Sequence, residues 1–161
     1  MIRPILITFL LLSACGGSTS GGPGFTPPPI AGRPEAPSDV SFASLLNGVR
    51  ISNGAESVIY DPNLGLAAQS HADDMLSQDY FSHVSLDGST FTDRAEAAGY
   101  DWVALGENIA QGQTSQTEVM DDWTNSPGHH ANNISTSFED FGLGRAGTGS
   151  DTRWVLMLGR E

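Results

Sequence analysis

The spacing of apolar residues changes near the C-terminal end of the sequence, and this change sets the fold class. Between residues 42 and 123, apolar residues recur at three- and four-residue spacing, which is typical of amphipathic helices. Residues 141–158 instead form two alternating runs, and the Gly147–Asp151 segment between them has the composition of a turn. Helices followed by a β-hairpin predict an α+β domain in which helices pack on an antiparallel sheet.

Local start and stop signals divide the chain further. Asp61-Pro62 is typical of a helix start, Gly99 of a helix end, and Ser115 with Glu118 has the spacing of a capping box. The expected elements are helices over about 42–50, 61–76, 90–98 and 115–123, a short helical turn opening at 126–127, and extended segments at 58–60 and 100–105. Alanines on one face of the second helix predict close packing against a neighbour. We expect the larger aromatic residues in the core: Phe42, Tyr80, Phe81, Trp123, Phe141 and Trp154.

The N-terminal residues have the order of an export signal. Arg3 precedes an apolar run over 5–12, and Leu-Ser-Ala-Cys at 12–15 resembles a bacterial lipoprotein lipobox. This predicts a signal peptide over 1–14, a lipid-modified Cys15, a Gly/Ser/Pro-rich tether over 15–37 and one folded domain over 38–161. The expected location is the bacterial cell envelope, facing the periplasm or on the outer membrane, or outside the cell. An ordinary signal peptide or an apolar N-terminal strand are the alternatives.

Composition narrows the chemistry of any site. Cys15 is the only cysteine, so an intramolecular disulfide and a thiolate zinc cluster are both excluded. Any metal site must use His, Asp, Glu or backbone oxygen. The net charge is −12 and the sequence has no lysine, which argues against nucleic acid as a partner.

Several segments occur in the order found in one known family. They are Leu-Asn-x-x-Arg at 46–50, Asp-Pro-x-Leu at 61–64, Tyr-Phe-Ser-His at 80–83, Gly-Glu-Asn-Ile-Ala at 106–110, Trp-x-x-Ser-Pro-Gly-His at 123–129 and a closing strand with Trp154. Together they resemble the CAP superfamily, and in particular its bacterial SCP-like extracellular branch, over about residues 41–159. The resemblance implies a three-layer α-β-α sandwich with a small antiparallel sheet between helical layers.

The resemblance also implies a site. The family's cleft of two histidines and two acids corresponds to His83, Glu107, Glu118 and His129, and in relatives it can hold a divalent cation, most often zinc. Two neutral imidazoles and two carboxylates are a reasonable zinc shell. His130 stands where bacterial members usually carry arginine, and we assign it to the cleft rim.

Each of these residues also has a purely structural interpretation. Glu118 could complete the capping box at Ser115, and Glu107 could anchor backbone amides of a tight loop at Gly106. His71, on the alanine-rich helix, is expected to be a buried, hydrogen-bonded histidine outside the site.

Three functional hypotheses follow. The favoured one is a non-enzymatic domain that holds a divalent cation and binds an extracytoplasmic peptide, lipid or glycan. A second is a metal-assisted hydrolase with Glu107 or Glu118 as general base. No His-Glu-x-x-His motif or nucleophile elbow supports an enzyme. In the third, the polar residues form only a structural network.

Overall fold

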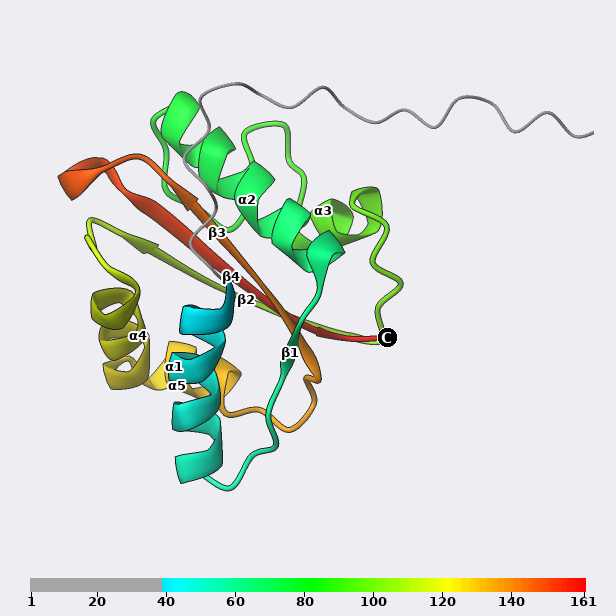
Figure 1. The fold of residues 1–161 in the computed structure, drawn as a ribbon. Helices are drawn as coiled ribbons and strands as arrows, with labels where there is room; N and C mark the ends of the chain where they lie inside the picture. The colour runs from blue at the N-terminus through cyan, green and yellow to red at the C-terminus, as the bar shows by residue number, and fades with distance from the viewer. Residues whose placement is uncertain (1–38) are drawn as a thin grey trace, which may run out of the picture. The chain divides into compact units, whose positions relative to one another are not determined.

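The computed structural model describes residues 39–161, which form a mixed sheet between two helical layers (Figure 1). In chain order the elements are α1 (Asp39–Ser52), β1 (Ile59–Tyr60), α2 (Pro62–Ser77), α3 (Phe91–Ala97), β2 (Ala104–Gln111), α4 (Gln116–Asn125), α5 (Pro127–Asn133), β3 (Asp140–Ala146), the 3-10 turn η1 (Gly149–Asp151) and β4 (Arg153–Arg160). The predicted signal peptide, Cys15 and tether lie outside the described residues.

The strand order is β1-β3-β4-β2. β4 pairs antiparallel with both β2 and β3, so the predicted C-terminal hairpin is confirmed. The two-residue β1 pairs parallel with β3, which makes the sheet mixed where the sequence predicted a purely antiparallel one. The α+β sandwich prediction is confirmed, with this one correction.

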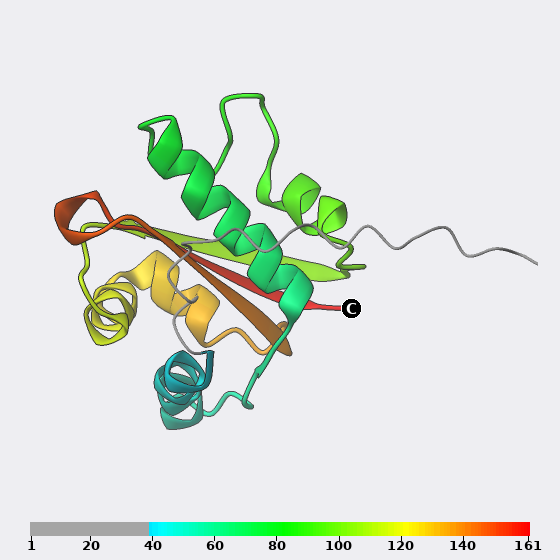
Figure 2. The same cartoon turned by 45° about the horizontal axis from the view of Figure 1, so that its top comes forward.

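The two faces of β4 divide the core into two halves. Leu156 and Leu158 pack with residues of α1 and α4, whereas Val155 and Met157 pack with residues of α2 and α3. Figure 2 shows the two helical layers on opposite sides of the sheet. Alternation along a strand sends successive side chains to opposite faces, so a single strand serves both cores. Phe81 does not join either core: it is 47 % exposed, and its predicted core position is wrong.

Helix α2 lies directly on the backbone of β3. A Cβ at Gly144 would lie 2.3 Å from the carbonyl carbon of Ala68, and one at Gly142 would lie 2.1 Å from that of Leu64. No side chain at these two strand positions fits between the two backbones, so glycine is required there. The predicted close packing of the alanine face is therefore confirmed, and β3 is its partner.

The start of α2 follows the predicted signal. Asp61 Oδ1 accepts hydrogen bonds from the backbone N–H groups of Asn63 and Leu64, both at 2.9 Å. Thr90 and Asp93 form a capping box at the start of α3. These local bonds satisfy helix N–H groups that have no partner within the helix.

A buried arginine joins α1 to the segment after α5. The Arg50 guanidinium donates to the carbonyl oxygens of Asn133 at 2.8 Å, Ser135 at 3.0 Å and Phe138 at 3.1 Å. Its Nε donates to the Glu56 carbonyl at 2.7 Å. These bonds hold α1 against the segment that connects α5 to β3.

Strand β2 is longer than predicted. The sequence predicted an extended segment ending near residue 105, but β2 continues through Gly-Glu-Asn-Ile-Ala to Gln111. Gly106 is needed because a Cβ there would lie 2.8 Å from the ring of Phe138. The alternative interpretation of Gly106 as a tight loop is therefore wrong. No helix within residues 39–161 combines the length and apolar character needed to cross a bilayer.

The contact between α2 and β3 makes a stability prediction. Gly144→Ala should lower the free energy of unfolding by about 2 kcal/mol, because the new methyl group forces the two backbones apart. Gly48→Ala is the matched control: it lies in α1 with nothing within 4 Å of the new Cβ, and alanine should raise helix stability by about 0.5–1 kcal/mol. Urea unfolding followed by circular dichroism measures both changes, and equal stability of the two variants would contradict the packing account.

Candidate functional site

A buried carboxylate on β2 is the centre of the site. The Glu107 side chain is 1 % exposed, and both of its oxygens are paired. His83 Nδ1 lies 2.7 Å from Oε1, and Arg94 Nη2 lies 2.8 Å from Oε2. An unpaired buried carboxylate would be costly, so the arginine serves as its counter-ion.

Arg94 also fixes the loop that carries His83. Its Nη2 donates to the His83 carbonyl at 3.0 Å, and its Nη1 donates to Ser85 Oγ at 3.1 Å and to the Ser89 carbonyl at 3.2 Å. One side chain on α3 therefore holds the 83–89 loop and the carboxylate of β2 together. The planar guanidinium suits this task because its donors point in fixed directions.

His71 on α2 contacts the chain just before the same loop. It is fully buried on α2, and its Nε2 donates to the Ser82 carbonyl at 2.9 Å. Burial lowers the pKa of His71, and the nearby charge of Arg94 lowers it further. A neutral ring with its proton on Nε2 fits these contacts. The prediction of a structural, hydrogen-bonded histidine is confirmed.

Helix α5 is tied to the other side of β2 by amide side chains. Asn108 Nδ2 donates to the His129 carbonyl at 3.1 Å and to Asn133 Oδ1 at 2.9 Å. Asn132 Nδ2 donates to Asn108 Oδ1 at 2.8 Å. His129 lies one turn before Asn132 and Asn133, so the three share the side of α5 that faces β2.

The imidazole of His129 is electrostatically coupled to that of His83. Burial lowers the pKa of His129, and the charge of protonated His83 lowers it as well. The neutral form of His129 is therefore favoured, and this is the form that binds metal ions and accepts hydrogen bonds.

The site spans the free edge of the sheet. The Glu107 side chain faces α3, while that of its neighbour Asn108 faces α5. The edge carbonyls of Glu107 and Ile109 accept hydrogen bonds from Asn132 Nδ2 and Trp123 Nε1, both at 3.3 Å. One histidine thus comes from each side of a strand whose edge carbonyls are already satisfied.

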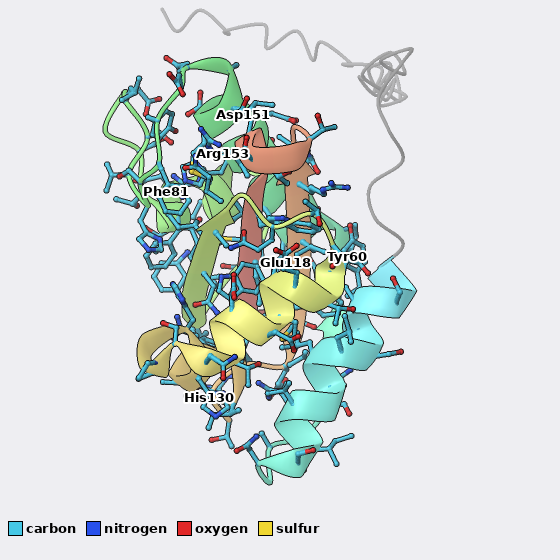
Figure 3. All side chains as sticks on the ribbon, turned by 90° about the vertical axis from the view of Figure 1, so that its left-hand side faces the viewer. Tyr60, Phe81, Glu118, His130, Asp151 and Arg153 are labelled. Atoms are coloured by element: carbon cyan, nitrogen blue, oxygen red, sulfur yellow. The ribbon has the colours of Figure 1, made fainter. Side chains whose placement is uncertain are left out.

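Glu118 lies elsewhere. It is exposed at the start of α4, where its Oε2 accepts from Thr114 N at 2.7 Å and from Thr114 Oγ1 at 2.9 Å (Figure 3). Its backbone N–H donates to Ser115 Oγ at 3.1 Å, so half of the predicted capping box is present. In a full capping box the Glu118 carboxylate would accept a hydrogen bond from the backbone N–H of Ser115. Here its hydrogen bonds come from Thr114. These hydrogen bonds lower the pKa of Glu118.

His130 lies on α5 beside His129 and is partly buried (Figure 3). Its assignment to the cleft rim stays a prediction.

Exposed apolar residues flank His83 in the sequence of its loop. Phe81, Val84 and Leu86 are 47 %, 46 % and 64 % exposed, respectively, and the His83 side chain is 49 % exposed. The hydrogen bonds from His71 and Arg94 hold this loop in place, so the apolar groups are presented on a fixed backbone.

The predicted tetrad is thus brought together in part. Within residues 39–161, no group of three or more His, Cys, Asp or Glu side chains is arranged to hold a metal ion. Glu107 is paired with Arg94 and His83, and Glu118 with Thr114. The imidazoles remain the donors that fit a cation, and the metal prediction stays a prediction.

Sequence reasoning missed Arg94 and Ser85. A signal for Arg94 was present in the composition: the chain has seven arginines, no lysine and nineteen acids, so each arginine in the folded region was a candidate counter-ion for a buried acid. Nothing in the sequence pattern pointed to Ser85.

Comparison with known proteins identifies relatives over most of the folded region. A model of the cysteine-rich secretory protein family, CAP, matches residues 43–158. The uncharacterized protein YkwD of Bacillus subtilis is 33 % identical over 120 residues, which are 71 % of this chain and 47 % of the relative. The uncharacterized membrane protein YlbC of the same organism is 30 % identical over 107 residues, 66 % of this chain and 31 % of the relative. The chain therefore spans less than half the length of either.

Solved structures share the fold. An extracellular protein with an SCP domain from Bacillus anthracis superposes with a TM-score of 0.70 and 26 % identity, over 76 % of this chain and 40 % of that one. An outer surface protein of Borrelia burgdorferi gives a TM-score of 0.68 at 22 % identity, over 76 % of this chain and 90 % of that one.

Proposed function

The chain belongs to the cysteine-rich secretory protein (CAP) family, and we propose that it is a non-enzymatic extracytoplasmic binding domain whose ligand site is built on His83 and His129. The observation that carries this proposal is the double pairing of Glu107 with His83 and Arg94. In this proposal the Glu107 carboxylate orients the His83 imidazole, and the imidazole contacts the ligand.

The pairing sets which nitrogen of His83 is available. An ionised carboxylate can only accept a hydrogen bond, so the proton of neutral His83 lies on Nδ1, 2.7 Å from Glu107 Oε1. The lone pair is then on Nε2, away from the carboxylate. A carboxylate that orients a histidine in this way is common behind metal-binding imidazoles.

The donor set suits a weakly held divalent cation, with zinc favoured. His83 and His129 would supply two nitrogen ligands, and water or an oxygen of the ligand would complete the shell. A bound cation would supply positive charge to an otherwise acidic protein, and would thereby favour a carboxylate, phosphate or hydroxyl oxygen of a peptide, lipid or glycan. The exposed apolar residues beside His83 would contact the rest of that ligand.

The hydrolase alternative has less support. A general base needs a carboxylate that can reach water, but Glu107 is buried with both oxygens paired. Glu118 reaches solvent but is held at the start of α4 by Thr114. The structural alternative uses the same contacts around Glu107 and predicts no ligand.

We also propose that the domain is held at the cell envelope by a lipid on Cys15, with residues 16–37 as a spacer. The lipobox-like Leu-Ser-Ala-Cys sequence supports this. The similarity to an extracellular SCP-domain protein fits a location outside the cytoplasm.

Zinc titration of the full chain by calorimetry tests the cation site. We expect micromolar binding at pH 7.5 that is lost in His83→Ala and His129→Ala. Binding should weaken at pH 5.5, because acid favours protonated imidazoles and a protonated ring cannot bind metal.

Two carboxylate variants separate the proposed roles. Glu107→Gln should weaken zinc binding about 10–100-fold, as expected when an orienting partner is removed. Glu118→Gln is the matched control and should bind like the wild type. Unchanged zinc binding in His83→Ala would contradict the proposal, and so would the absence of zinc binding in the wild type. The second result would favour the hypothesis that the polar residues form only a structural network.

Cell fractionation tests the anchor. Cys15→Ala should move the protein from the membrane fraction to the soluble fraction, because the only thiol that could carry a lipid is removed. Retention of the variant in the membrane fraction would show that the lipobox prediction is wrong.

A further inference from the structure

A groove runs along α2 beside α3 and the 85–89 loop, and His71 lines part of it. Its first part, about 350 Å³, lies between the C-terminal half of α2 and the 85–89 loop and is polar. Its second part, about 190 Å³, lies between the middle of α2 and α3, and is lined mainly by Leu66, Ala67, Ala97 and Ala98. Ser70 and Arg94 line both parts, so the two parts adjoin. Figure 2 shows α3 and the preceding loop running beside α2.

The polar end of the groove is acidic. Asp74 on α2 and Asp87 on the loop line it from opposite walls. Hydrogen bonds from Ser89 lower the pKa of Asp87, so this carboxylate is ionised at neutral pH. Asp74 accepts hydrogen bonds from Gln78 and Tyr80, which hold its carboxylate in position.

One cation, Arg94, lines both parts of the groove, and its charge helps to lower the pKa of Asp87. The charge of Arg94 is balanced by Glu107 at 2.8 Å. Burial lowers the pKa of His71, so this ring is neutral at pH 7. The groove therefore pairs an apolar end, which carries the half-exposed Leu66, with a negatively charged end.

We propose that this groove binds an extended basic peptide segment, with an aliphatic side chain at the Ala97–Ala98 end and a lysine or arginine at the Asp74–Asp87 end. From Leu66 to Asp74 along α2 is about 12 Å, at about 1.5 Å per residue. In an extended peptide, residues four apart lie about 13 Å apart and point to the same side. The preferred ligand therefore has an aliphatic residue and a basic residue at positions i and i+4.

Defined peptides test this by NMR with the isotope-labelled full chain. The probe is Ac-Gly-Leu-Ser-Thr-Ser-Lys-Gly-NH2, and we expect saturable shifts of backbone amides in α2 and α3. Replacing its lysine with glutamate should abolish binding. Moving the lysine next to the leucine should weaken binding several-fold.

Protein variants locate the contacts. The Asp74→Asn, Asp87→Asn double variant should weaken probe binding about tenfold, on the scale of two exposed charge pairs, and more so at low salt. Leu66→Ser should weaken it several-fold. Asp121→Asn, on α4 in the opposite helical layer, is the matched control and should bind like the wild type. His83→Ala should also bind the probe normally, which keeps this test separate from the cation site.

Three outcomes would overturn the proposal. The first is no shift in α2 or α3, and the second is unchanged affinity in the double aspartate variant. The third is equal binding of the lysine and glutamate peptides, which would indicate an apolar ligand such as a lipid chain.

Discussion

The arrangement of this domain around its site depends on neutralising one buried carboxylate. Glu107 lies in an edge strand with 1 % of its side chain exposed, where an unpaired charge would be strongly destabilising. Arg94 supplies the opposite charge, and its remaining donors hold the loop that carries His83. The ion pair therefore does more than stabilise the fold. It links strand, loop and helix so that one imidazole is held in a fixed orientation at the protein surface.

The close contact of α2 with β3 makes this arrangement possible. Gly142 and Gly144 let the backbone of α2 pack against that of β3. His71 is buried on the same helix and donates a hydrogen bond to the Ser82 carbonyl. On the other face of the sheet, Asn108 and its partners on α5 fix the backbone around His129. The two histidines thus reach the edge of β2 from separate helical layers, each through its own set of hydrogen bonds.

Much of the fold could be predicted because its signals are local. The caps at Asp61 and Thr90 and the alternation in the C-terminal hairpin each depend on residues within a few positions of one another. The parallel pairing of β1 could not be predicted, since it joins residues about eighty positions apart through only two pairs. For the site, the sequence indicated His83, Glu107 and His129 but not the role of Glu107, because Arg94 reaches it only in the folded chain. The sequence assigned Glu118 to the same site, but in the structure its carboxylate is held by a local hydrogen bond from Thr114.

The proposed site requires the proton of neutral His83 to lie on Nδ1. Two-bond ¹⁵N–¹H correlation spectra of the imidazoles in the full chain at pH 7.5 measure this directly. His83 should show the Nδ1–H tautomer, because it donates to Glu107. His71 provides an internal contrast and should show the Nε2–H tautomer, because it donates to the Ser82 carbonyl. A proton on Nε2 of His83 would mean that Glu107 does not orient this ring, and would contradict the proposed site.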